Sequence, residues 1–297
     1  MHPTRAPVVV TRPDANALPI VVDSPHSGTA YPADFGSCLA PLALRQGEDT
    51  WVERLYAGAP AAGATLIAAQ FPRVYIDPNR SLLDIDADLL DAPWPGPVEP
   101  GRKTELGIGL VWRLMAGQPI YDRRLAVAEV QQRIDRCWRP YHAALQAELD
   151  ASLVAGGGAR WHLNVHSMPD DSYRRLGLPE KPLADFVLGN LDGATSDAAT
   201  LELLAAPLRA HGFSVAFNDP FKGVEIIRAS GRPATGRHSV QIEVKRSLYM
   251  DERFEPHVGF ERVRAAIDAM LQQLAGAARS ATGRPSDASG SPRSARG

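Results

Sequence analysis

Cysteine is scarce in this chain of 297 residues, where only Cys38 and Cys137 occur. The two lie far apart, and neither belongs to a Cys-x-x-Cys pair of the kind that binds zinc or forms a redox centre. We therefore expect two reduced thiols and a cytoplasmic location, since thiols stay reduced in that compartment.

The sequence also lacks long hydrophobic runs and an excess of charge. No stretch reaches the roughly 18 apolar residues that span a bilayer, and residues 1–13 have no apolar core of a secretory signal. The formal net charge is -2, so no general basic field attracts nucleic acid or anionic lipid. We expect a small-molecule partner, with local arginines binding any anion. The oligomeric state stays open.

Nucleotide-binding loops and the serine-hydrolase elbow are missing too. The string Gly107-Ile108-Gly109 has no third glycine of a dinucleotide loop, and no Gly-Lys-Ser/Thr of a phosphate loop occurs. Several serines neighbour histidines in the sequence, but no Gly-x-Ser-x-Gly string is present. A serine hydrolase is therefore a rival hypothesis without a motif to support it.

Short apolar runs rich in β-branched or aromatic residues predict buried strands. They cover residues 8–11, 20–23, 65–69, 74–76, 161–166, 186–189, 214–217 and 240–244. Helical periodicity covers residues 123–155, with Pro140 expected to kink or divide the helix. Two further helices are predicted over 196–212, with Ser196 as its cap and Gly212 as its left-handed stop, and over 260–278.

Strands that alternate with helices predict an α/β protein with a mixed, mostly parallel sheet and helices on both faces. No break in composition divides the chain, so we expect one catalytic domain over residues 1–281. Residues 91–121 are rich in proline and glycine and interrupt the alternation, which predicts a long loop or lid. Residues 282–297 are almost entirely small, polar or charged, and we expect a disordered tail.

Polar residues gather after four of the predicted strands, where the reactive groups of open α/β sheets meet. A lone histidine at such a place is more often structural. His26 and His166 together, with Glu48 or Asp49 as a carboxylate, form the usual nitrogen and oxygen ligand set of catalytic zinc. The other interpretation of the two carboxylates is negative charge in the first turn of a helix.

Two further positions indicate chemistry. Glu243 lies inside an apolar run, where an unpaired carboxylate is costly to bury. Either it forms a structural ion pair or it is a general base facing a water molecule. Asn79 and Arg80 follow an Asp-Pro turn, and this arginine either belongs to ordinary turn chemistry or binds a carbonyl or carboxylate.

The chain resembles the N-formylglutamate amidohydrolase family over roughly residues 20–250, because four strings occur in that family's order. They are Ser24-Pro25-His26-Ser27-Gly28, Asp77-Pro78-Asn79-Arg80-Ser81, Val165-His166-Ser167-Met168-Pro169 and Gln241-Ile242-Glu243. The family is similar in turn to zinc carboxypeptidases and aspartoacylases. The resemblance implies a zinc carboxypeptidase or phosphorylase-hydrolase-like fold and a metal-dependent amidohydrolase.

Carried over residue by residue, the resemblance makes His26 and His166 ligands of one zinc ion and Glu243 the general base. Asp49 completes the ligand set, with Glu48 as its alternative, because the carboxypeptidase position three residues after the first histidine is Thr29 here. A further departure is Asn164, where the resemblance leads us to expect an aspartate that orients a ligand.

The same comparison makes Arg80 a catalytic residue that stabilises the oxyanion and Asn79 its substrate-binding neighbour. Arg113, in residues 91–121, and Arg228 are predicted to hold substrate carboxylates. The implied reaction is hydrolysis of N-formyl-L-glutamate to formate and L-glutamate, with a place in histidine degradation. The alternatives are a metallohydrolase for another N-acyl amino acid or small peptide, and a non-catalytic anion-binding protein on the same fold.

Overall fold

The computed structural model describes residues 6–155, 157 and 159–283. The strands of this part of the chain are β1 (Val8–Thr11), β2 (Ile20–Ser24), β3 (Thr65–Ala69), β4 (Leu114–Met115), β5 (Gln118–Pro119), β6 (Arg160–Met168), β7 (Phe186–Gly189), β8 (Val215–Phe217) and β9 (Arg237–Lys245).

The α-helices of the described residues are α1 (Pro41–Arg45), α2 (Val52–Leu55), α3 (Arg102–Glu105), α4 (Val127–Arg133), α5 (Arg139–Ala155), α6 (Ser172–Arg175), α7 (Ala198–Ala210), α8 (Glu225–Ser230) and α9 (Gly259–Ala281). Shorter helical turns are η1 (Pro60–Ala62), η2 (Ala87–Leu89), η3 (Ile134–Trp138), η4 (Pro233–Thr235) and η5 (Arg246–Leu248).

Seven of the strands form one sheet in the order β1-β3-β2-β6-β9-β7-β8. The β3–β2, β2–β6, β6–β9 and β7–β8 pairs are parallel. The β1–β3 and β7–β9 pairs are antiparallel. The predicted mixed, mostly parallel sheet is therefore confirmed. The central strands β2 and β6 are buried along their whole length.

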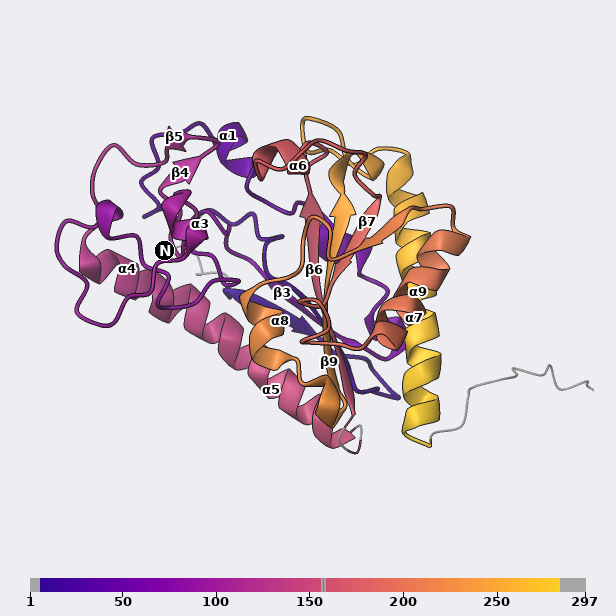
Figure 1. The fold of residues 1–297 in the computed structure, drawn as a ribbon. Helices are drawn as coiled ribbons and strands as arrows, with labels where there is room; N and C mark the ends of the chain where they lie inside the picture. Colours follow the sequence, from indigo (N-terminus) through magenta and orange to yellow (C-terminus); the bar gives the residue numbers. More distant parts are fainter. Residues whose placement is uncertain (1–5, 156, 158, 284–297) are drawn as a thin grey trace, which may run out of the picture.

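Helices cover both faces of this sheet, as the sequence predicts (Figure 1). Helix α5 contacts β1, β2, β3 and β6 on one face, and α8 contacts β6 and β9. On the other face α7 and α9 pack against each other and share an apolar core with side chains of the central strands. The arrows of β6 and β9 point toward the end of the sheet at which α3, β4, β5 and α6 lie.

The predicted strand at residues 74–76 is wrong. Val74, Tyr75 and Ile76 are buried, as their apolar character indicates, but they form a turn without a strand partner. The carbonyl of Tyr75 accepts a hydrogen bond from Arg133 Nη1 at 3.0 Å instead of a ladder bond. A short buried segment rich in apolar residues can therefore be either a strand or a turn covered by a helix, and the sequence pattern does not distinguish the two.

The predicted division near Pro140 is confirmed. Helix α4 ends at Arg133, a π-helical turn η3 follows, and α5 begins at Arg139. Proline has no backbone N–H to continue the regular ladder, and the wider π turn accommodates that loss.

The predicted cap of α7 is off by one residue, because Asp197, rather than Ser196, accepts a hydrogen bond from Thr200 N at 2.8 Å.

Three other expectations bear on the chain as a whole. Cys38 and Cys137 are both free. No helix in the described part of the chain combines the length and the hydropathy needed to cross a membrane. Of the predicted tail, residues 284–297 lie outside the described residues.

The core between α9 and the sheet offers a direct test of this packing. Leu274 on α9 is fully buried, so Leu274→Ala should lower the free energy of unfolding by about 2 to 5 kcal/mol through lost burial and the cavity left behind. Leu42→Ala, at a leucine that is 57% exposed on α1, should change it by less than about 1 kcal/mol. Urea unfolding of both variants measures the difference, and equal effects would contradict this packing.

Candidate metal centre and active-site cavity

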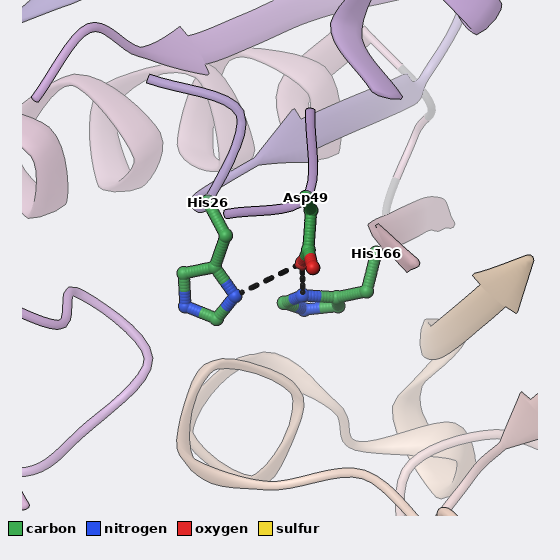
Figure 2. Close-up of side chains that lie close together, drawn as sticks. All are labelled: His26, Asp49 and His166. Atoms are coloured by element: carbon green, nitrogen blue, oxygen red, sulfur yellow. Dashed lines mark hydrogen bonds and ion pairs between the residues drawn. The ribbon is translucent and has the colours of Figure 1, made fainter. Parts of the chain in front are cut away.

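Three buried side chains meet at the carboxyl edge of the sheet. His26 follows β2, Asp49 lies between α1 and α2, and His166 belongs to the last part of β6. Their nearest ligand atoms all lie within 4.8 Å of one another. Figure 2 shows both rings turning a nitrogen toward the Asp49 carboxylate. Nδ1 of His26 lies 3.2 Å from Asp49 Oδ2, and Nδ1 of His166 lies 3.0 Å from the same oxygen.

The far nitrogen of each ring is held by an acceptor. Nε2 of His26 lies 2.7 Å from Asp77 Oδ1, and Nε2 of His166 lies 2.7 Å from Asn164 Oδ1. With a metal ion bound, both contacts would favour the tautomer with the proton on Nε2, which frees the two Nδ1 lone pairs for the metal. Two imidazole lone pairs and a carboxylate oxygen around one point are the donor set of zinc. These residues therefore fit a metal ion.

Asn164 takes the place at which the family resemblance leads us to expect an aspartate. It stays compatible with a ligand site, because its amide oxygen still accepts from His166 while its Nδ2 donates to Asp23 at 3.0 Å. Asp23 also accepts from Tyr141 at 2.6 Å. A buried carboxylate is thus connected to His166 through the intervening amide.

The strand register produces this arrangement. Asp23 pairs with Asn164 across β2 and β6, and Asn164 pairs with Gln241 across β6 and β9. His166 pairs with Glu243 one pleat further along. Directly paired residues of parallel strands point to the same face, so these side chains share one side of the sheet.

Asp49 is held from both sides. Its Oδ1 accepts hydrogen bonds from Arg246 at 3.1 Å and from Ser167 at 3.2 Å. Burial alone would raise the pKa of Asp49, but hydrogen bonds from His166 and His26 outweigh it and keep this pKa well below its usual range. Burial lowers the pKa of His166 to about 4, so its ring is neutral near pH 7 and can act as a ligand.

Glu48, the alternative acidic ligand, points elsewhere. Its carboxylate accepts from Tyr31 at 2.5 Å and from Thr50 at 3.0 Å. It lines a second cavity with Ser27 and Trp51 rather than the one that contains the histidines. The structure therefore brings Asp49, and not Glu48, to His26 and His166.

Glu243 lies in the same cavity as the three candidate ligands. Burial, reinforced by the negative charge of Asp49, raises the pKa of Glu243 to about 8. Gln241 Nε2 donates to its Oε1 at 2.9 Å. Of the two interpretations from the sequence, a structural ion pair finds no support, because Glu243 forms no salt bridge within the described residues.

Asp77 was not assigned a role from the sequence, although it is part of the Asp-Pro-Asn-Arg string. Besides contacting His26, its carboxylate accepts from Arg73 at 2.8 Å and from Trp112 at 3.2 Å, and it lies 3.6 Å from Arg80. Burial would raise the pKa of Asp77, but positive Arg73 and Arg80 hold it well below the usual range. The one feature of the sequence that could have indicated a role for Asp77 is its position, because this carboxylate directly follows a buried apolar segment.

The turn that carries Asp77, Asn79 and Arg80 is fixed by the interrupted helix α4-η3-α5. Trp138 Nε1 donates to the carbonyl of Arg80 at 3.1 Å, and His142 Nε2 lies 2.7 Å from the carbonyl of Pro78. Asn79 lies between the sheet and α8, because its Oδ1 accepts from Ile226 N at 3.1 Å while its Nδ2 is 3.2 Å from His166 Nε2. The turn therefore places Asn79 beside the candidate ligands.

A cavity of about 620 Å³ is lined by the three candidate ligands and by Glu243, Asn79 and Arg80. The predicted loop of residues 91–121 supplies part of its wall through α3, the β4–β5 hairpin and the residues between them. Cationic side chains are prominent in the lining, namely Arg73, Arg80, Lys103, Arg175 and Arg246. The sequence did not single out Arg73, Lys103, Arg175 or Arg246 as cavity residues, since arginine and lysine are common on every surface.

The two predicted carboxylate clamps lie outside this cavity lining. Arg113 donates from Nε to Asp86 at 2.7 Å. Arg228 is 65% exposed and pairs with Glu225 on its own helix at 2.6 Å. The structure thus brings Asn79, Arg80 and Glu243 to the candidate ligands, whereas Arg113 and Arg228 form ion pairs with Asp86 and Glu225.

One series of side chains resembles the catalytic triad of a serine hydrolase, but it is buried. Asp23, His162 and Ser239 are joined in series, with 2.7 Å from Asp23 Oδ1 to His162 Nε2 and 3.0 Å from His162 Nδ1 to Ser239 Oγ. All three are buried, with exposures of 0%, 1% and 0%, and none lines the cavity. A substrate cannot reach this serine, so these three hydrogen-bonded residues have a structural role in the interior.

The fold and the site together indicate an α/β protein with a candidate metal centre at the carboxyl edge of its sheet. The chain belongs to the N-formylglutamate amidohydrolase family, whose model matches residues 18–250. It is 32% identical over 265 residues to the N-formylglutamate deformylase of Pseudomonas putida, covering 86% of this chain and 91% of the relative. The Pseudomonas aeruginosa deformylase is 32% identical over 269 residues, with coverages of 86% and 92%.

Solved structures show the same relationship. The crystal structure of an N-formylglutamate amidohydrolase from Ralstonia eutropha JMP134 is 51% identical in sequence with a TM-score of 0.90, and the match covers 93% of this chain and 99% of that one. A protein from Agrobacterium tumefaciens, 19% identical with a TM-score of 0.62 and coverages of 93% and 95%, shares the fold.

The contact between Asp77 and His26 can be tested through metal affinity. In Asp77→Asn the amide oxygen accepts more weakly than the carboxylate and no longer offsets Arg73, so His26 should be a poorer ligand. We expect affinity for a divalent metal ion to fall about 10- to 100-fold. Competition with a chromophoric chelator measures it. Asp185→Asn, which removes a carboxylate paired with Lys245 outside the cavity lining, should leave the affinity unchanged; equal affinities of both variants would contradict the assignment.

The raised pKa of Glu243 predicts a pH-dependent cost in stability. Below the unfolded pKa of about 4.3 the carboxyl is neutral in both states. As the pH rises toward 8, the unfolded chain ionises while folded Glu243 does not, so stability is lost over that interval. In metal-free protein, Glu243→Gln should therefore exceed wild type in stability by about 1 to 4 kcal/mol at pH 9 and by much less at pH 4.5.

Urea unfolding of wild type and Glu243→Gln at the two pH values, in the presence of a chelator, measures this difference. Exposed Glu252→Gln is the matched control and should show no such dependence on pH. A constant difference between Glu243→Gln and wild type at both pH values would show that burial does not raise this pKa.

Proposed function

We propose that the protein hydrolyses the amide bond of N-formyl-L-glutamate to give formate and L-glutamate, and that it needs one zinc ion. The observation that carries the proposal is the buried group of His26, Asp49 and His166 in one cavity with Glu243. The relatives named N-formylglutamate deformylase support the substrate, as does the Ralstonia eutropha amidohydrolase, which matches nearly the whole chain.

His26 and His166 would bind the metal through Nδ1, and Asp49 through Oδ2, with Asp77 and Asn164 fixing the two rings. A zinc ion held there supplies Lewis acidity, which polarises the formyl carbonyl and makes water a better nucleophile at neutral pH. Arg246 and Ser167 keep the second oxygen of Asp49 occupied, so the carboxylate presents its Oδ2 to the metal.

Glu243 is the proton carrier of this proposal. Its carboxylate takes a proton from the attacking water as the bond from water oxygen to formyl carbon forms. The same group then delivers that proton to the amide nitrogen as the carbon–nitrogen bond breaks, so that formate and the free amine leave. A carboxyl with a pKa raised to about 8 is matched to both transfers near neutral pH.

Arg80 would stabilise the oxyanion that develops on the formyl oxygen. Its Nη1 and Nε are held by the carbonyls of Asn79 and Ile108 at 2.9 and 3.1 Å, so the guanidinium is fixed before substrate arrives. Fixed donors of this kind contribute about 3 to 4 kcal/mol to other hydrolases. Asn79 would contact the substrate beside it, and residues 91–121 would form a lid over both within a single catalytic domain of residues 1–281.

A related activity has one observation in its favour. The cavity of about 620 Å³ admits acyl groups larger than formyl, so another N-acyl amino acid is a second candidate substrate. The Glu243 and metal roles would be the same for it. Comparing N-formyl- with N-acetyl-L-glutamate distinguishes the two.

The first experiment is to measure glutamate release from N-formyl-L-glutamate before and after metal removal by a chelator, and again after zinc is restored. Glutamate release should stop when the metal is removed and should return when zinc is restored. Glu243→Gln should keep its zinc but lose at least about 100-fold in kcat. Activity that survives complete metal removal would exclude the zinc role, and a zinc-loaded protein inactive on the formyl compound would exclude this substrate.

A further inference from the structure

Lys103 differs from the other cations of the cavity in having no partner. Arg246 is bound to Asp49, Arg73 is bound to Asp77, and Arg175 is bound to Asp171. The side-chain ammonium of Lys103 makes no hydrogen bond or ion pair with any of the described residues, although the side chain is half-buried in the wall formed by α3.

The backbone holds Lys103 next to Arg80. The carbonyl of Lys103 accepts from Ile108 N at 2.8 Å, and the carbonyl of Ile108 accepts from Arg80 Nε at 3.1 Å. The α3 turn is in turn tied to Asp84, which accepts from Gly101 N at 3.1 Å and from the hydroxyl of Thr104. The placement of the Lys103 backbone beside the cavity is therefore a property of the folded segment.

An unpaired ammonium beside a guanidinium is electrostatically unfavourable in a partly buried cavity. Burial, reinforced by the positive charges of Arg80 and Arg73, lowers the pKa of Lys103 to about 8. Asp77 and Glu243 act in the opposite direction but do not outweigh these effects, and Asp77 already contacts His26 and Arg73. An anionic group of a ligand would relieve this repulsion and replace the missing partner.

We infer that Lys103 binds the side-chain carboxylate of the substrate, and so selects acidic N-acyl amino acids over neutral ones. The inference rests on the proposed function and names its specificity determinant. The α-carboxylate is adjacent to the scissile nitrogen and stays near Asn79 and Arg80, beside the candidate ligands. The side-chain carboxylate lies farther from the reacting bond, where residues 91–121 close the cavity. Arg113 and Arg228 are paired with Asp86 and Glu225, whereas the ammonium of Lys103 has no such partner among the described residues.

The test compares N-formyl-L-glutamate with N-formyl-L-glutamine, which has the same shape but a neutral side chain. Lys103→Met should lower kcat/KM for the glutamate compound about 10- to 100-fold, mainly through KM, because one charged hydrogen bond is lost. For the glutamine compound it should change kcat/KM by less than about threefold. Lys103→Arg should retain part of the preference, since the charge is kept. Lys181→Met, at an exposed lysine outside the cavity lining, should match wild type with both substrates.

An equal loss with both compounds would make Lys103 a structural residue, and an unchanged preference would remove it from the site. Wild-type inactivity on both compounds would instead contradict the proposed function. Calorimetric binding of L-glutamate and L-glutamine to zinc-loaded wild type and Lys103→Met then decides the inference separately. The inference holds if wild type binds glutamate at least about 10-fold more tightly and Lys103→Met does not. It fails if wild type does not distinguish the two ligands.

Discussion

The carboxylate of Asp49 is the group on which the rest of the site depends. It is buried, and one of its two oxygens, Oδ2, faces the Nδ1 atoms of both His26 and His166. A buried anion is stable only when every neighbour compensates for the lost water. Arg246 and Ser167 compensate on one side, and the histidine rings do so on the other. Those rings can face Asp49 only because Asp77 and Asn164 hold their far nitrogens.

The same requirement extends outward through the protein. Asp77 is a second buried anion, and it is offset by Arg73 and Arg80. The turn that carries Arg80 is held by Trp138 and His142 from the interrupted helix on the sheet's face. The irregular η3 turn therefore has a structural consequence at the site. Trp138 is the last residue of η3, so this π turn itself supports the site, and π turns often lie near functional residues.

Glu243 illustrates how a site differs from a core. A glutamine at this position would avoid the desolvation that raises the pKa of the carboxyl, yet only a carboxyl can accept and return a proton. Lys103 follows the same pattern with the opposite charge, since it is half-buried beside Arg80 without an ion-pair partner among the described residues. An unpaired cation of this kind is a group that an anionic substrate can stabilise.

The sequence by itself determined the alternation of strands and helices, and it placed His26, His166 and Glu243 after or within strands that end at one edge. These follow from local periodicity, because an apolar run with a polar end behaves alike in most contexts. Only the tertiary structure distinguished Asp49 from Glu48, which are adjacent in sequence but point into different cavities. It alone showed the contacts of Asp77 and the position of Lys103 in the cavity wall. It also paired Arg113 with Asp86 and Arg228 with Glu225, and it made residues 74–76 a turn. The physical reason is that side-chain direction and charge compensation depend on residues distant in the chain, which local pattern does not specify.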